Sequence, residues 1–277
     1  MSSTAVGKDS QMQDGRFSGE SIHVVRSEWD VYFETALAML RQIKQNRAAR
    51  KPTVMIVPVG PIEQYAILAR LINEQSLPLH DVSFFNMDEY LADNMLRVQL
   101  EHPMSFRRRM DEEFYSRVNP DLVMPETQRH FPEPGREAEF DGLLDSLGGA
   151  DLCVGGLGIN GHIAFNEPPE EGGAMTVKEF ASLGTRVLPI SRETRTVNAI
   201  GYQRGDLREM PQWCITIGMK QILSSRSIFI ALNRDWQHGI LRHVLFDTIQ
   251  PQIPATLLRL HSDVHFCTTE RIAQGIH

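Results

Sequence analysis

Two short segments of the sequence bring together side chains that can move protons. In the first, GGLGINGHIAFNEPP at residues 155–169, Asn160, His162 and Glu167 lie among glycines. Histidine accepts and donates protons near neutral pH because its unperturbed pKa is about 6.5. Glu167 is near enough along the chain to bind the second ring nitrogen and fix the tautomer. We therefore predict an acid–base pair here; the alternative is a loop histidine bonded to the backbone.

The second segment is FFNMDEYL at residues 84–91, where an apolar strand pattern ends in Asn86, Asp88 and Glu89. A carboxylate at the end of a buried strand loses part of its hydration, which raises its pKa and makes it a better acceptor for the proton of a weak carbon acid. Asp88 is therefore the predicted base. Its alternative role is to cap the next helix, but Glu89 and Asn86 are also available for capping.

The glycines of the first segment match a dinucleotide-binding fingerprint, G-x-G-x-x-G, at Gly156, Gly158 and Gly161. That fingerprint needs a helix that begins at the third glycine and holds a pyrophosphate at its N-terminus. Here Pro168 and Pro169 would end such a helix after barely one turn. We expect instead that the glycines let the backbone approach a small substrate, with N–H groups free to bind its oxygens.

Residues that bind metals or form disulfides show no typical spacing in this chain. The histidines do not pair into HExxH, and Cys153, Cys214 and Cys267 are scattered without a short pair. We predict reduced, buried thiols and no metal.

Strands and helices that could position the two segments alternate along the chain. Strands that are apolar at every position and separated by helices require helices on both faces of a mostly parallel sheet. In such sheets the ligand binds at the carboxyl ends of the strands, so both segments are expected at one edge. Predicted strands cover residues 53–59, 82–85, 152–154, 214–217 and 228–232, and predicted helices cover residues 29–43, 62–72, 106–115, 140–147 and 236–245.

The first residues of the chain differ in composition from the rest. Residues 1–21 are polar without an apolar period and are predicted to be a disordered arm, whereas residues 22–277 are predicted to form a single α/β domain. Ser27 and Asp30 predict a capping pair at the start of the first helix.

The composition is that of an ordinary globular protein, with 277 residues, 42% hydrophobic residues and a net charge of −7. The negative charge argues against nucleic acid or an anionic membrane as a partner. The one basic run, residues 107–109, is followed by three acidic residues and is predicted to be a solvated helix face. The polar start and the lack of a long apolar run predict a cytoplasmic protein.

Five motifs, taken in order, resemble those of the glucosamine-6-phosphate deaminase (isomerase) family over about residues 22–272. Lactonases related to that family look like this chain more loosely. The motifs are NMDEY at residues 86–90, EHPMSF at 101–106, GLGINGHIAFNEP at 156–168, TRTVNA at 194–199 and LHSDVHF at 260–266.

The resemblance implies a Rossmann-like α/β sandwich of three layers and a reaction without a cofactor. In that reaction a 2-amino-2-deoxy sugar phosphate becomes a ketose phosphate and ammonia. By the same resemblance Asp88 moves a proton between C1 and C2, His162 opens the sugar ring, Glu167 orients the histidine, and Asn160 holds the geometry. Such chemistry needs a carboxylate beside the carbon acid and a separate acid–base pair for ring opening.

The expected phosphate anchor departs from the family pattern. The family's loop after the first strand is rich in Gly, Ser and Thr; here Gly60 remains, but Pro61 lacks an N–H and Ile62 lacks a hydroxyl. A lysine expected after the strand ending at Leu232 is missing, whereas Arg195 matches the family's phosphate-binding arginine. The substrate can therefore differ from glucosamine 6-phosphate.

The sequence thus predicts an enzyme that converts a small sugar or sugar phosphate, with the oligomeric state left open. The alternatives are a sugar sensor with little turnover, an isomerase of a non-amino or non-phosphorylated sugar, and a nicotinamide-dependent oxidoreductase. Predicted substrate-binding residues are Gly60, Glu89, Gly158, Gly161 and Arg195.

Overall fold

The computed structural model describes residues 21–170 and 173–276. The predicted arm at residues 1–21 therefore lies, apart from Ser21, outside the described residues. Within them, seven strands form a central sheet in which every pair is parallel. In sheet order these are β1 (Ile22–Val25), β10 (Val264–Thr269), β9 (Ile228–Leu232), β6 (Leu152–Gly155), β2 (Thr53–Val57), β3 (Val82–Asn86) and β5 (Arg129–His130).

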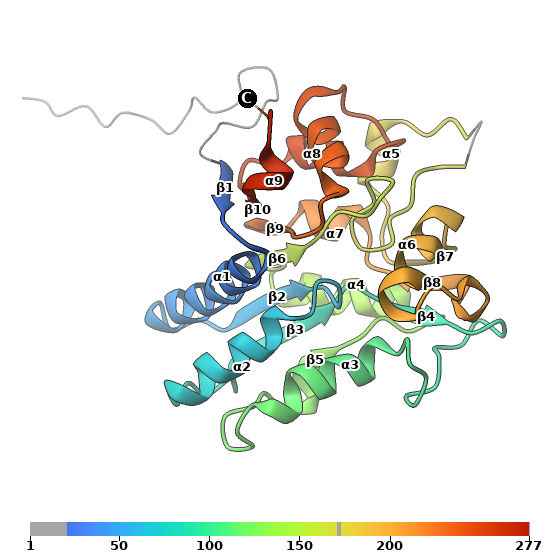
Figure 1. Cartoon of the computed structure of the whole chain (residues 1–277). Coiled ribbons are helices and arrows are strands. Elements are labelled where there is room, and N and C mark those ends of the chain that lie inside the picture. The colour runs from blue at the N-terminus through green and yellow to red at the C-terminus, as the bar shows by residue number, and fades with distance from the viewer. Residues whose placement is uncertain (1–20, 171–172, 277) are drawn as a thin grey trace, which may run out of the picture.

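Helices cover both faces of this sheet, as predicted (Figure 1). Alternate residues of β2 enter different cores, because successive side chains of a strand point to opposite faces: Met55 packs with α1 and α2, and Ile56 packs with α4 and α8. The helices are α1 (Glu28–Ala48), α2 (Gln64–Glu74), α3 (Phe106–Glu113), α4 (Glu137–Ser146), α5 (Val177–Ala181), α6 (Arg192–Tyr202), α7 (Met219–Leu223), α8 (Gln237–Phe246) and α9 (Glu270–Ala273).

The predicted cap of the first helix is confirmed. The Ser27 side chain accepts from the backbone N–H of Asp30, while the Asp30 carboxylate accepts from the Ser27 backbone N–H, so both orphan donors are satisfied. The helix itself runs further than predicted, to Ala48. Among the described helices, none combines the length and apolar content needed to span a membrane.

A second, three-stranded antiparallel sheet lies at the right of Figure 1 and consists of β4 (Asp88–Leu91), β8 (Trp213–Thr216) and β7 (Arg186–Pro189). The sequence predicted that residues 214–217 form a strand of the parallel sheet. The strand is confirmed, but its assignment to the parallel sheet is wrong. β8 is apolar because it is the buried centre of the small sheet, and burial alone does not identify a pairing partner. Asp88 and Glu89, predicted to lie in a loop, are residues of β4.

The chain passes from the central sheet to the small one at a single residue. The N–H of Met87 donates to the carbonyl of Val57 at the end of β2 (3.0 Å), and the carbonyl of Met87 accepts from the N–H of Ile217 just after β8 (2.7 Å). Because Met87 bonds to the ends of both sheets, β4 follows β3 directly. Asp88 is therefore fixed opposite Thr216 in the small sheet.

Thr216 also attaches the glycine-rich segment to the small sheet. Its hydroxyl accepts from the backbone N–H of Phe165 (2.9 Å), and the Asn166 amide donates to the carbonyl of Ile217 (2.9 Å). Thr216 is fully buried, so the N–H of Phe165 has no access to water as a substitute partner. The end of β8 thus holds both chemistry-bearing segments.

We expect Thr216→Val, which keeps the shape but removes the acceptor, to lower the free energy of unfolding by about 1–3 kcal/mol, the cost of a buried unpaired donor. Thr268→Val is the matched control, because the buried Thr268 hydroxyl has no hydrogen-bond partner among the described residues. That variant should be nearly neutral in urea unfolding. Equal losses in the two variants would contradict the role of Thr216.

Candidate active site

Both predicted segments meet at the carboxyl edge of the central sheet, as expected. Asp88 pairs with Thr216, whose hydroxyl holds the backbone of Phe165, two residues before Glu167. The buried thiol of Cys214 is within electrostatic reach of both carboxylates: burial, and next the negative charges of Asp88 and Glu167, raise its pKa well above its usual value. The predicted acid–base groups therefore belong to one site.

Asp88 supplies a carboxylate with few favourable contacts. The residue is 6% exposed, and within the described part of the chain its carboxylate has no hydrogen-bond partner. Burial, and next the negative charge of Glu89, raises the pKa of Asp88 well above its usual value. The predicted rise in pKa is confirmed. Such a carboxylate, once ionised, is a stronger base than a solvated aspartate.

Glu89 is turned away from any ligand and binds the start of α3. It is fully buried, and its two oxygens accept from the backbone N–H groups of Phe106 (2.9 Å) and Arg107 (3.1 Å). Burial raises the pKa of Glu89, although these N–H groups and the Arg107 charge oppose the rise. The contacts of Glu89 thus show the helix-capping role rather than the predicted substrate contact, because no oxygen faces an open space.

The basic run at residues 107–109 is only partly the solvated helix face that the sequence predicts. Arg108 does pair with Glu112 at the surface (2.7 Å). Arg107 instead points inward, where its guanidinium donates to the carbonyl of Val98 (2.6 Å) and lies 3.3 Å from the Glu89 carboxylate. The prediction is wrong for Arg107 because the buried charge of Glu89 attracts it.

His162 lies in a polar cluster formed by two elements. Its Nδ1 is 2.8 Å from Asn160 Oδ1 and 3.1 Å from the hydroxyl of Thr194, but 3.7 Å from Glu167 Oε1. The Asn160 amide nitrogen donates to the other Glu167 oxygen, so Asn160 Oδ1 is the acceptor that faces the ring. Nδ1 therefore carries the proton in the neutral ring, and Nε2 is the nitrogen that can accept one.

Glu167 accepts from the Asn160 amide, and its Oε1 lies 3.7 Å from His162 Nδ1, so the direct hydrogen bond that the sequence predicts is not formed. Burial alone would raise the pKa of Glu167, but the interactions with His162, Thr194 and Asn160 outweigh it and lower the pKa to about 2. Glu167 is thus ionised near neutral pH, and its negative charge lies close to the His162 ring.

Sequence reasoning missed the two hydroxyl residues that complete the cluster. Ser191 caps α6 by accepting from the backbone N–H of Thr194 (3.2 Å), and its hydroxyl lies 3.2 Å from the Asn160 amide nitrogen. Ser191 at the cap position, with Glu193 in the first turn, is a helix-start signal that could have located α6. It could not have shown that this helix start packs against His162.

Two of the glycines are explained by contacts within the loop. A Cβ on Gly158 would lie 2.1 Å from His162 Nε2, so the imidazole rests directly on this α-carbon. Gly161 has φ +85°, and a Cβ there would lie 2.7 Å from Ile253. The predicted free N–H groups are wrong for both, because Gly158 donates to the His162 carbonyl and Gly161 to the Gly158 carbonyl. The loop closes on itself.

The dinucleotide alternative fails on the same loop. Residues 161–170 are described and contain no helix, so no helix N-terminus is available to hold a pyrophosphate there. Among the described residues, no group of three His, Cys, Asp or Glu side chains is arranged to hold a metal ion. The three cysteines are free and buried, as predicted.

The remaining two predicted residues lie on the flanks of the cluster. Gly60 is exposed in the loop after β2, beside the glycine-rich segment: its carbonyl is 3.6 Å from the position of a Cβ built on Gly156. Arg195 follows Thr194 in the first turn of α6, and its Nε is buried without a hydrogen-bond partner among the described residues. Arg195 thus carries a buried donor that no described residue satisfies.

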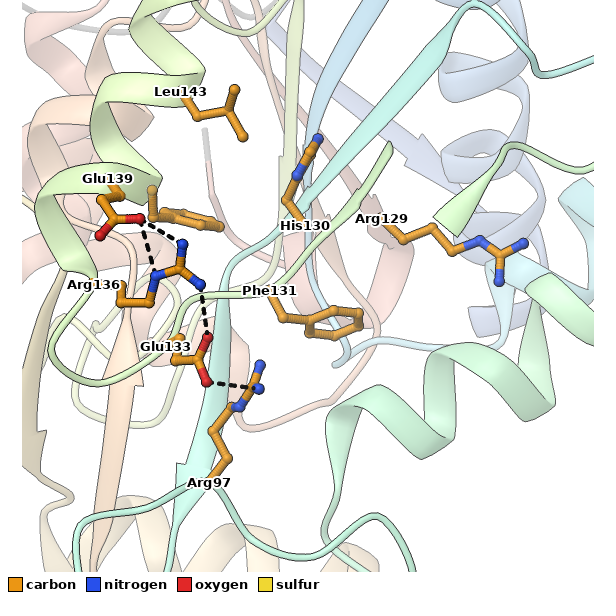
Figure 2. A pocket seen from close by; sticks show the side chains of 9 residues that line it. Arg97, Arg129, His130, Phe131, Glu133, Arg136, Glu139 and Leu143 are labelled. Atoms are coloured by element: carbon orange, nitrogen blue, oxygen red, sulfur yellow. Dashed lines mark hydrogen bonds and ion pairs between the residues drawn. The ribbon is translucent and has the colours of Figure 1, made fainter. Parts of the chain in front are cut away.

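A separate cavity of about 470 Å³ lies near the ends of β5 and α4 and is shown in Figure 2. One wall is a chain of ion pairs, in which Arg97 binds Glu133 (3.0 Å) and Arg136 binds Glu133 (3.6 Å) and Glu139 (2.6 Å). Arg129 points away from this chain (Figure 2). No predicted site residue lines the cavity, and the four charged side chains of this wall are already paired with one another.

The structure is thus an α/β fold whose sheet edge carries a cluster of acid–base side chains. No family model matches the chain. Glucosamine-6-phosphate deaminase of Aliivibrio salmonicida is 31% identical over 223 residues, covering 78% of this chain and 77% of the relative. The corresponding protein of Clostridium perfringens is 28% identical over 216 residues, covering 77% and 83%. The chain belongs to the glucosamine-6-phosphate deaminase family.

Solved structures agree on the fold. A monomeric glucosamine-6-phosphate deaminase superimposes with a TM-score of 0.78 at 24% identity, covering 91% of this chain and 98% of that one. A 6-phosphogluconolactonase from Thermotoga maritima superimposes with a TM-score of 0.63 at 16% identity, covering 90% and 98%. The fold is therefore common to deaminases and lactonases, and the reaction has to be argued from the site.

We expect Gly158→Ala to displace the His162 ring, because the added carbon would lie 2.1 Å from it. Overpacking of this kind costs about 1–3 kcal/mol of stability. NMR signals of the His162 ring and urea unfolding measure both effects. In Gly142→Ala the new carbon meets open space within helix α4, and a gain of about 0.5–1 kcal/mol is expected. Unchanged ring signals in Gly158→Ala would contradict the contact.

Asp88→Asn tests the buried carboxylate through the pH dependence of stability. Asp88 in the unfolded chain titrates near 3.8, whereas its folded pKa is raised. Between these two pKa values the folded state binds more protons than the unfolded state. The contribution of Asp88 to the free energy of unfolding is therefore fully present below the unfolded pKa, and it is lost as pH rises through the folded pKa. The Tm of the variant minus that of wild type should therefore increase from about pH 4 upward. A difference independent of pH would contradict the burial of the charge.

Proposed function

We propose that the protein is a deaminase and isomerase of a 2-amino-2-deoxy sugar, which it converts into the corresponding ketose and ammonia. The observation that carries this proposal is the unpaired, buried carboxylate of Asp88 at the same sheet edge as the His162 cluster. The relatives' name, glucosamine-6-phosphate deaminase, supports an amino sugar as the substrate.

Ring opening is the proposed task of His162. Its Nε2 takes the proton of the C1 hydroxyl and returns a proton to the ring oxygen as the bond between that oxygen and C1 breaks. The imidazolium formed in between is stabilised by the ionised Glu167, whose geometry is kept by Asn160 and Thr194. The product of this step is the open-chain aldehyde.

Proton transfer between carbons is the proposed task of Asp88. Its carboxylate removes the proton from C2 while the aldehyde oxygen takes a proton from the substrate's ammonium group, which gives an enolamine, and the protonated carboxyl then gives its proton to C1. C2 becomes an iminium, water adds to it, and ammonia leaves. C1 is reduced as C2 is oxidised within one molecule, so the reaction needs no external oxidant. The substrate's ammonium group beside Asp88 favours the ionised form of a carboxyl whose pKa is raised.

We expect Asp88→Asn to lower ammonia release by at least about a hundredfold, the usual scale for loss of a general base. Solvent deuterium incorporation at C1 or C2 should be lost with it. The assay uses a panel of hexosamines and their 6-phosphates, and Asp121→Asn, at an exposed site, is the control that should keep wild-type rates. Wild-type deuterium exchange in Asp88→Asn would refute the assignment. Sugar binding by the wild type without ammonia release would indicate a sensor instead.

A further inference from the structure

The carboxyl edge of the central sheet extends past the reactive groups along the ends of β2, β6 and β9. The segments after β2 and β6 contact each other and the end of β9: a Cβ built on Gly156 would lie 3.3 Å from Pro61 Cδ and 3.5 Å from the carbonyl oxygen of Ala231, a residue of β9. His162 lies in the segment after β6. A sugar with C1 and C2 between Asp88 and His162 therefore has the loops after β2 and β9 available for its distal carbons, and we call this region the distal subsite.

Backbone N–H groups in loops of this kind can hold an anion when they have no other partner. In the distal subsite, side chains of the protein already bind them. The N–H of Ile62 donates to the Glu63 carboxylate (3.2 Å), and the N–H groups of Asn233 and Arg234 both donate to Gln237 Oε1 (2.8 and 2.9 Å). These three donors are therefore not free to bind a phosphate.

Further hydrogen bonds fix both loops in this arrangement. The buried Gln237 side chain also donates to the carbonyl of Leu157 (2.9 Å), which ties the loop after β9 to the glycine-rich segment. In the loop after β2, the Gln64 amide donates to the Pro61 carbonyl (2.6 Å) and the Tyr65 hydroxyl donates to the Pro58 carbonyl. Pro61 itself has no N–H to offer.

The charges of the distal subsite also disfavour a dianion. Glu63 and Glu28 both contribute negative charge near Tyr32, and Arg234, which lies 3.9 Å from Glu28, opposes them. Burial is the largest cause, and together with the two glutamates it raises the pKa of Tyr32 to about 12. The Tyr32 hydroxyl accepts from the Asn233 amide (2.7 Å). Two carboxylates against one guanidinium leave this group of residues with a net negative charge.

We propose that the distal subsite takes an uncharged hydroxyl end of the sugar, so that the substrate is a 2-amino-2-deoxy sugar without a distal phosphate, and that Glu63 determines this specificity. The inference rests on the proposed function, because only that reaction places the sugar between Asp88 and His162. A half-buried carboxylate repels a phosphate but accepts a hydrogen bond from a hydroxyl. The same residue therefore excludes one substrate and binds the other.

The first test compares kcat/KM for ammonia release between glucosamine, galactosamine and mannosamine and their 6-phosphates, using the full-length wild-type protein. For the best sugar of the panel, we expect the ratio of phosphorylated to unphosphorylated substrate to lie below 1. A ratio above 1 would overturn the inference while leaving the proposed reaction intact. If no sugar of the panel releases ammonia or binds in calorimetry, the proposed function itself fails.

The second test changes the charge alone. Glu63→Gln keeps the size of the side chain and should raise the phosphorylated-to-unphosphorylated ratio at least about tenfold, since it removes a repulsive charge. Glu74→Gln, at the other end of α2 and paired with Arg70 (2.7 Å), is the matched control and should leave the ratio unchanged. Calorimetric binding of each sugar pair to Asp88→Asn gives the same comparison without turnover. An unchanged ratio in Glu63→Gln would overturn the role of Glu63.

Discussion

The position of the reactive carboxylate depends on the two backbone hydrogen bonds of Met87. One joins it to the end of β2 in the parallel sheet and the other to the segment after β8 in the antiparallel sheet. Because both bonds belong to one residue, the chain cannot form a flexible loop between the sheets. Asp88 therefore starts a strand, is largely shielded from water, and lies across from Thr216, to which the histidine segment is attached.

The two neighbouring carboxylates then acquire different roles from their surroundings. Glu89 receives backbone N–H groups at the start of α3 and lies near the charge of Arg107, which offsets part of the cost of its burial. Asp88 has no such donors among the described residues, and the neighbouring charge of Glu89 adds to the cost of ionising it. Environment, rather than residue type, separates the structural carboxylate from the reactive one.

The same sheet edge carries the polar cluster and, beside it, the loops after β2 and β9. Asp88 begins β4 just after β3, and His162 and Glu167 lie in the segment after β6. Glu63 and Gln237 accept from backbone N–H groups of the loops after β2 and β9. Because these loops lie outside the cluster, their contacts can change without altering the groups proposed for proton transfer.

Sequence alone was sufficient for features that depend on local pattern. Apolar runs predicted β2, β3, β6 and β9 and hence the parallel sheet, the pair Ser27 and Asp30 predicted a helix start, and the motifs containing Asp88 and His162 predicted the family. Only the tertiary structure decided the partner of each group, because the partners lie far apart along the chain. It placed β8 in the small sheet, turned Glu89 and Arg107 toward each other, closed the glycine loop on its own N–H groups, and brought Thr194 to His162. A pattern in the sequence reports whether a residue is buried or polar, whereas its bonding partner is set by the packing of distant segments.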